Sequence, residues 1–242
     1  MKESGLGDRF FLAGYDLSGD INSLDTISGG PAVLEVTGID KGVPERVAGL
    51  RNGQMAFTAL FNPAAGATAH ARLSGLTSAD TICTYFHGTT LGNVAASMVA
   101  KQIGYDPTRA DSGDFKFKVA MQANAYGLEW GNMYTPGIRT DTTATTGTSI
   151  DTLTSQAFGL QAYLHVFAFA GTSVTVTIED SANNSTFAAV SGAAFTAATG
   201  ITSQRIAVTG TVRQYVRVTT SGTFTNAQFA VMINKNFTAV TW

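Results

Sequence analysis

Alternation of apolar and polar residues predicts β-strands along most of the first half of the chain. In "GQMAFTALF", residues 53–61, and in "FKFKVAMQA", residues 115–123, every second residue is apolar. Because successive side chains of a strand point to opposite faces, each segment is predicted to be a half-buried strand. The segments "PAVLEVTGI" and "TICTYFHG" are bounded by turn residues and are predicted as further strands.

One segment of this half has a different period. "GNVAASMVAKQIG", residues 92–104, spaces its larger apolar residues approximately as a helix does. Asn93 is a suitable N-cap and Gly104 a suitable stop. The pattern predicts one helix of about three turns lying against the sheet.

The pattern of the second half predicts strands along almost all of its length. "SVTVTIED", "RQYVRVTT" and "AQFAVMINK" alternate or are continuously apolar, and turn-rich pieces such as "DSANNS" separate them. Short strands at this spacing are typical of an antiparallel sandwich. The predicted fold class is therefore mainly β: an N-terminal β-sandwich with one flanking α-helix, plus a C-terminal antiparallel β-sandwich.

The distribution of charge suggests where the two parts meet. Of the 32 charged residues, 24 lie in residues 1–139, which leaves eight in 140–242. "TDTTATTGTSIDTLTSQ", residues 140–156, is rich in Thr, Ser and Gly, as a linker or long exposed loop would be. We predict two domains, residues 1–145 and 156–242.

Overall composition limits the classes of partner. Charged residues are only 13% of the chain, against about a quarter in typical domains, so the surface must be largely Thr, Ser, Asn, Gly and Ala, which suits assembly or secretion. The net charge of -2 provides no basic field for general nucleic-acid binding. Neither an export signal nor an apolar run long enough to span a membrane is expected, so no membrane insertion is predicted.

The residues that could carry chemistry are sparse. His70, His87 and His165 are far apart and form no metal-binding pair motif. His165 is in phase with Tyr163 on an apolar strand, which favours a structural role over a catalytic one. No nucleophile elbow, phosphate loop or dinucleotide fingerprint occurs. We therefore predict no catalytic, cofactor-binding or metal-binding residues, and a protein that is not an enzyme.

Two acidic segments are candidate metal sites. "DLSGDINSLD", residues 16–25, spaces its oxygen-bearing side chains as a calcium loop does. However, Ile21 and Ile27 stand where that loop needs glycine and glutamate. We interpret it as a strand leaving a polar turn. "YDPTRADSGD", residues 105–114, is interpreted as an acidic turn, with a weak divalent-ion site as the alternative.

Trp130 and Trp242 are candidate anchors of cores or interfaces. Exposed aromatic side chains also bind sugars. The exposure of the two tryptophans therefore decides between anchoring a core or interface and binding a sugar.

With the order of elements in place, one segment resembles a known family. Residues 14–63 read "GYDLSGDINSLDTISGGPAVLEVTGIDKGVPERVAGLRNGQMAFTALFNP". They resemble the tail tube (major tail) proteins of long-tailed bacteriophages, particularly those of actinobacterial hosts. The matching positions are Asp16, Ser18, Gly19, Thr37, Gly49, Leu50, Gly53, Phe61 and Pro63.

The resemblance implies a homo-oligomer in which a β-sandwich with one helix forms hexameric rings, and the rings stack into a hollow tube. DNA would pass through the lumen during ejection without specific binding, and neighbouring tail proteins would be the other partners. The location implied is the tail of the virion, assembled in the host cytoplasm. The second sandwich resembles the Ig-like or carbohydrate-binding-like modules that decorate phage proteins, and a host-surface glycan is its possible ligand.

The family also implies a projecting arm, expected at residues 38–52. Its charged residues would pair across subunits while its apolar residues become buried, and a solvated loop is the alternative. The candidate inter-subunit residues are Lys41, Val43, Glu45, Arg46, Val47, Leu50 and Arg51.

Other functions remain open from the sequence. One is a different virion component, such as a capsid decoration or tail-tip protein. Another is a carbohydrate-binding module or a glycosidase, the latter needing two carboxylates about 5–10 Å apart.

Overall fold

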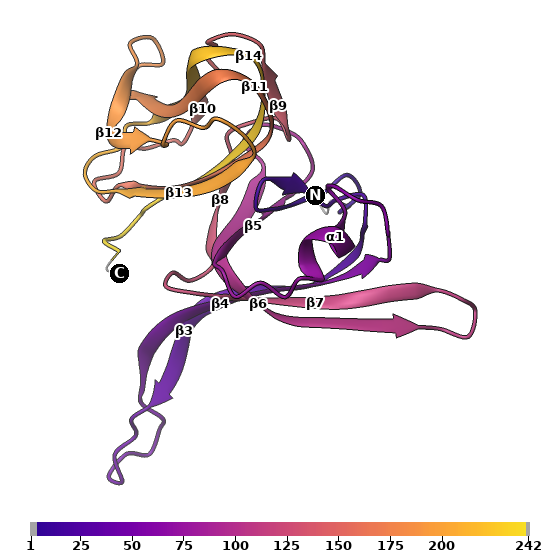
Figure 1. Cartoon of the computed structure of the whole chain (residues 1–242). Helices are drawn as coiled ribbons and strands as arrows, with labels where there is room; N and C mark the ends of the chain where they lie inside the picture. The colour runs from indigo at the N-terminus through magenta and orange to yellow at the C-terminus, as the bar shows by residue number, and fades with distance from the viewer. Residues whose placement is uncertain (1–3, 241–242) are drawn as a thin grey trace.

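The computed structural model describes residues 4–240, which form a mainly β protein (Figure 1). The prediction of a mainly β fold is confirmed. The elements in chain order are β1 (Arg9–Leu12), β2 (Tyr15–Asp16), β3 (Ile21–Glu35), β4 (Arg46–Leu60), α1 (Ala69–Leu73), β5 (Thr81–Phe86), β6 (Val94–Arg109), β7 (Phe115–Ala123), β8 (Glu129–Met133), β9 (Arg139–Asp141), β10 (Ile150–Asp151), β11 (Leu160–Ser181), β12 (Ala188–Ala194), β13 (Thr202–Val208) and β14 (Tyr215–Lys235).

The N-terminal half is built on the strand pairs that alternation predicted. β4 and β7 pair antiparallel, so that Phe57 lies opposite Val119 and Ala59 opposite Phe117. These side chains are buried in one core, together with Cys83. The strands predicted at residues 53–61 and 115–123 are therefore confirmed.

The helix predicted at residues 92–104 is wrong, because this segment forms the central strand β6. Ala96, Met98 and Ala100 are buried in the core of the N-terminal half. Ala95 is buried in a second core on the opposite face. A strand covered on both faces carries apolar residues at nearly every position, which a helical period can match by chance. A short helix lies instead at α1, capped by Thr68, whose side chain accepts a hydrogen bond from the Ala71 N–H.

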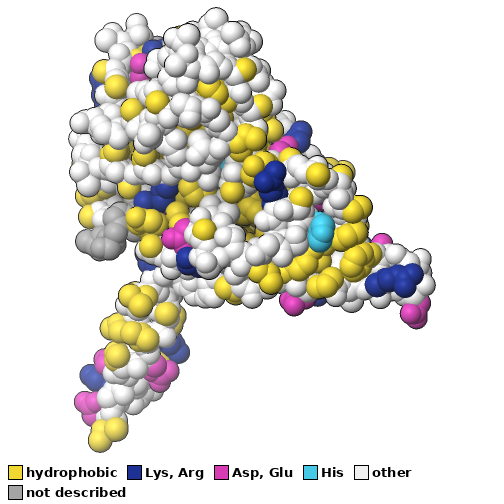
Figure 2. Space-filling view, in the orientation of Figure 1, with side chains coloured by type: hydrophobic (Ala, Val, Ile, Leu, Met, Phe, Trp, Pro, Cys, Tyr) yellow, Lys and Arg dark blue, Asp and Glu magenta, His cyan; other side chains and the backbone are white. Residues whose placement is uncertain are grey.

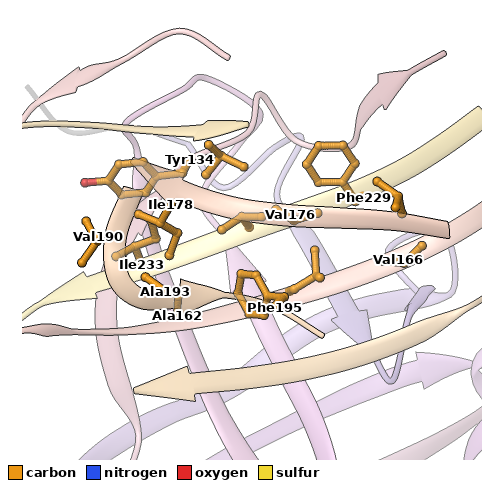
Figure 3. Close-up of a cluster of buried hydrophobic side chains, with 14 of the residues drawn as sticks. Tyr134, Ala162, Val166, Val176, Ile178, Val190, Ala193, Phe195, Phe229 and Ile233 are labelled. Atoms are coloured by element: carbon orange, nitrogen blue, oxygen red, sulfur yellow. The ribbon is translucent and has the colours of Figure 1, made fainter. Parts of the chain in front are cut away.

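In the C-terminal half, β11 and β14 form a long antiparallel pair that bends. Breaks in register separate the halves of β11, and Gly171 and Gly222 have positive φ there. As a result, the first half of β11 pairs with β13 and its second half with β12. The resulting layers enclose a core that includes Val176, Phe195 and Phe229 (Figure 3).

Hydrogen bonds join the two halves through β8. This strand pairs with β6 on one side and with β14 on the other. The predicted linker at residues 140–156 is not a free connection, because β9 and β10 also pair with β14. Small polar residues suit these short edge pairings as well as they suit a loop. The division into domains 1–145 and 156–242 stays a prediction.

Candidate assembly surface

A two-stranded hairpin projects from the N-terminal half (Figure 1). β4 pairs with β7 only at residues 54–60, whereas residues 46–53 pair with β3 alone. We call residues 28–52 the arm. Within the described chain, both edges of the arm lack a strand partner, so their backbone groups are open to another chain.

The arm exposes apolar side chains along its length. Leu50 is 87% exposed, and Figure 2 shows the gathering of apolar residues on this projection. The exposed large apolar residues of the arm are Val33, Leu34, Val36, Ile39, Val43, Val47 and Leu50. Such a patch on a hairpin that is itself marginal in water indicates a surface that another protein covers.

The structure places all seven predicted inter-subunit residues in the arm. Val43, Val47 and Leu50 are exposed, as a contact surface requires. Lys41 and Glu45 form an ion pair with each other at 3.5 Å across the turn. Arg51 lies at the base, where its side chain covers Gly127. The inter-subunit roles of these residues stay predictions. The arm is longer than the expected residues 38–52, because β3 forms its other strand.

A pair of glycines fixes the base of the arm. Gly29 and Gly53 lie opposite each other, and Leu128 sits on the pair. A Cβ added at Gly53 would lie 2.6 Å from the Leu128 nitrogen, and one at Gly29 would lie 2.6 Å from the Leu128 Cβ. The absence of side chains at both positions therefore allows the segment before β8 to hold the arm in place.

Gly53→Ala is expected to lower the free energy of unfolding by about 1–3 kcal/mol, because Leu128 and its backbone must shift. Urea unfolding followed by circular dichroism would measure the loss. Gly104→Ala is the matched control, since an added Cβ there meets no atom closer than 3.4 Å. Equal losses in the two variants would show that close packing against Leu128 is not the reason why glycine is needed at positions 29 and 53.

A second projecting hairpin, β6–β7, carries charged residues at and near its tip. At its tip, the Ala110 N–H donates to the Asp114 carbonyl, and Gly113 adopts a positive φ. Asp114 pairs with Lys116 at 2.6 Å, and Asp106 lies opposite Lys118. The interpretation of residues 105–114 as a turn is correct at its end, although its first five residues belong to β6.

The carboxylates of "DLSGDINSLD" hold the local structure. Asp16 accepts a hydrogen bond from the Ser18 N–H and one from Arg9. Asp20 accepts from the Asn62 amide and from the Ala69 N–H at the start of α1. Among residues 4–240, no group of three or more His, Cys, Asp and Glu side chains is placed to hold a metal ion.

His70 and His87 each contact a polar neighbour close by. A ring nitrogen of His70 lies 2.5 Å from the Tyr105 hydroxyl, and His87 lies 3.0 Å from Asp8. Among residues 4–240, neither histidine belongs to a group of three or more His, Cys, Asp and Glu side chains that could hold a metal ion.

His165 is buried where the two halves meet. Its Nδ1 accepts the Gly14 N–H at 3.1 Å, so its Nε2 carries the proton and donates to the Thr84 hydroxyl at 2.8 Å. Burial lowers the pKa of His165 to about 3. A neutral histidine with both nitrogens bonded agrees with the structural role inferred from its strand.

The depressed pKa of His165 predicts a loss of stability in acid. The unfolded chain binds a proton near the ordinary pKa of 6.5, and the folded chain does so only near 3. The free energy of unfolding should therefore fall between pH 6.5 and 3 by up to about 1.4 kcal/mol per pH unit from this residue. Denaturant unfolding across this range would show a shallower slope for His165→Asn. Identical slopes for both proteins would contradict the assignment.

A buried ion pair also joins the halves. The Glu129 side chain of β8 accepts hydrogen bonds from the Tyr163 hydroxyl at 2.7 Å and from Arg205 at 3.2 Å. Arg205 also lies over the Tyr126 ring at 3.7 Å. Desolvation raises the pKa of Glu129, and the nearby Arg205 opposes that shift. Glu129, Tyr163 and Arg205 satisfy one another's hydrogen bonds in the buried site. The cluster therefore fits a role in holding the C-terminal half against β8.

Neither a protein-family model nor a curated protein sequence matches the chain. Solved structures similar to it include a chain of the native gene transfer agent virion, with 14% identity and a TM-score of 0.43 over 53% of this chain and 98% of that one. A chain from the tail of the empty gene transfer agent particle has 16% identity and a TM-score of 0.39, over 53% and 96%. The phage SPP1 Dit protein has 11% identity and a TM-score of 0.33, over 94% and 98%. Because these TM-scores are below 0.5, we base the functional proposal on this chain's own residues.

Among residues 4–240, no helix is both long and apolar enough to cross a membrane. Trp242, a candidate anchor, lies outside the described residues.

Proposed function

We propose that the chain is a structural subunit of a phage tail, which assembles through its arm into rings that stack as a tail tube. The arm is the observation that carries this proposal. It offers open strand edges and seven exposed apolar side chains to another molecule. The resemblance of residues 14–63 to tail tube proteins supplies the type of assembly, with six subunits in each ring.

The energetics require that much of the arm be covered in the assembly. Burying one Val, Leu or Ile side chain contributes about 1.5–3 kcal/mol. Association costs about 4–15 kcal/mol in lost freedom of motion. Two or three buried side chains would only offset that cost, so a stable contact must cover most of the apolar residues. A repeated head-to-tail contact of this kind closes into a ring.

A conduit for DNA should not hold the DNA as it passes. The net charge of -2 fits that requirement, since tight phosphate binding needs clustered cations. We infer a structural rather than a catalytic role in the virion tail, with assembly in the host cytoplasm. The carboxylates of residues 16–25 and Glu129 are engaged in holding the fold, which supports that inference.

A single ring at the tail tip is the second candidate. The C-terminal half is fixed to the first half by the pairing of β8 with β14 and by the buried pair of Glu129 and Arg205. This attachment favours a C-terminal half that is an integral part of the subunit rather than a tethered decoration, and such a subunit could form a single ring through the same arm without stacking.

Negative-stain electron microscopy over a concentration series would test the proposal. The comparison variant replaces residues 34–47 by Asn-Gly, which reconnects the paired residues Val33 and Ala48 by a tight turn. We expect rings or tubes from the native chain and monomers from the variant, with the same circular dichroism. Stacked tubes would favour the tube subunit and isolated rings the tip protein. A native chain that stays monomeric throughout would overturn both.

A further inference from the structure

A cleft of about 480 Å³ opens where β8, β10 and the end of β14 meet. This volume is in the range of small-molecule sites, about 300–1,000 Å³. Residues of both halves line it, among them Trp130 and Asn132 of β8, Asp151 of β10 and Asn234 of β14. The cleft is separate from the arm.

Four of the large exposed apolar side chains line this cleft. Trp130 is 48% exposed and Phe237 is 71% exposed, and Val94 and Leu153 are exposed beside them. Single exposed apolar residues are ordinary, but a group of four around one hollow marks a binding surface. The exposure of Trp130, which the sequence left open, is thereby settled.

Polar groups with free bonding capacity lie among these apolar side chains. Asn132 donates its amide to the Gly92 carbonyl at 2.8 Å, and Asn234 donates to Gln161 at 3.2 Å. Each amide oxygen remains available to accept from a ligand hydroxyl. The cleft thus combines a flat aromatic surface with hydrogen-bond acceptors.

The wall formed by residues 151–154 is held in shape before any ligand binds. Lys235 donates to the Thr152 hydroxyl and to the carbonyls of Thr154 and Arg213. Asp151 accepts the Leu153 N–H at 2.7 Å, and Leu153 adopts a left-handed φ of 68°. A left-handed conformation at a bulky residue persists only where its surroundings impose it.

We propose that this cleft binds a neutral oligosaccharide, with a sugar ring stacked on Trp130 and its hydroxyl groups bonded to Asn132 and Asn234. A pyranose has a C–H face and a rim of hydroxyl groups, which match the indole and the amides respectively. An anionic ligand would need a free cation, whereas Lys235 is engaged by three oxygens and Asp151 lies beside it. A purely apolar ligand would leave the amides unused. The proposal does not depend on ring assembly.

Tryptophan fluorescence of the full chain tests the proposal directly. The sequence contains two tryptophans, so Trp242→Phe leaves Trp130 as the only reporter. This variant is titrated with tetra-N-acetylchitotetraose, cellotetraose and maltotetraose, which are all neutral. We expect a saturable change in emission with at least one of them. Asn132→Ala and Asn234→Ala should each weaken that binding about two- to tenfold.

Calorimetry with Trp130→Ala completes the test, because this change removes the stacking surface. Phe158→Ala is the matched control, since Phe158 is an exposed aromatic residue outside the cleft. We expect loss of sugar binding in the first variant and unchanged binding in the second. No saturable response to any of the three sugars would overturn the proposal. If, in addition, Trp130→Ala fails to form particles, the cleft is a contact with a second copy of the chain and not a sugar site.

Discussion

Arg205→Ala is expected to lower the free energy of unfolding by about 3–5 kcal/mol at neutral pH, the cost of leaving a buried charge unpaired. The Glu129 side chain is fully buried and would keep only the Tyr163 hydroxyl as a strong donor. The loss would fall on the contact between the two halves, since Glu129 is on β8 and Arg205 on β13. Guanidinium unfolding at pH 7 would measure it.

The loss should shrink as the pH is lowered. Desolvation already raises the folded-state pKa of Glu129 above its ordinary 4.5, and removal of Arg205 would raise it further. A carboxyl with a raised pKa contributes stability that is complete below pH 4.5 and is lost as the pH rises through its folded-state pKa. The difference between the native chain and Arg205→Ala should therefore be largest at neutral pH and smaller near pH 4.5.

Two further variants separate the buried charge from other effects. Arg217→Ala breaks the ion pair with Glu179, which is more exposed, and should cost about 0–1 kcal/mol from that pair. Replacing both partners, as Glu129→Leu with Arg205→Met, should recover stability relative to Arg205→Ala, because no unpaired charge remains. Equal losses for Arg205→Ala and Arg217→Ala, with no dependence on pH, would contradict the interpretation.

The contrast between β6 and its neighbours shows which part of this fold the sequence could predict. β4 and β7 have one face in the core and one toward solvent, so alternation identifies them. β6 lies between two cores, and its run of Ala, Met and Val loses the alternation that distinguishes a strand. The pairing of β6 with β5, β7 and β8 decides its conformation, and the period of a single segment does not show which neighbouring segments will pair with it.

The same limit applies to the candidate sites. The arm's exposed Val43, Val47 and Leu50 are predicted through the resemblance of residues 14–63 to a known family, not through a local pattern of apolar residues. The bond from Gly14 to His165 joins residues 151 positions apart, so no local pattern predicts it. The sugar cleft likewise depends on β8, β10 and β14 coming together, and Trp130 is the one residue of it that the sequence indicates as a candidate.

Leu34→Asp combined with Val47→Lys is expected to weaken assembly about 10- to 100-fold. Leu34 and Val47 lie directly opposite each other on the arm. Opposite charges in a cross-strand pair stabilise a hairpin, so the arm should stay folded while two apolar side chains are lost from the contact. Both side chains are about half exposed in the free chain, so each loss removes about half of the 1.5–3 kcal/mol of full burial, which gives this range of dissociation constants. Sedimentation velocity over a concentration series would measure the change.

Lys41→Ala distinguishes apolar burial from charge pairing as the source of assembly. Lys41 pairs with Glu45 of its own chain, and both side chains are about half exposed. An exposed pair of this kind contributes about 0–1 kcal/mol, so its removal should weaken assembly less than about fivefold. An effect as large as that of the double variant would mean that charges drive the contact. A double variant that assembles normally, with an unchanged unfolding transition, would show that the apolar face of the arm is not the surface that neighbouring subunits cover.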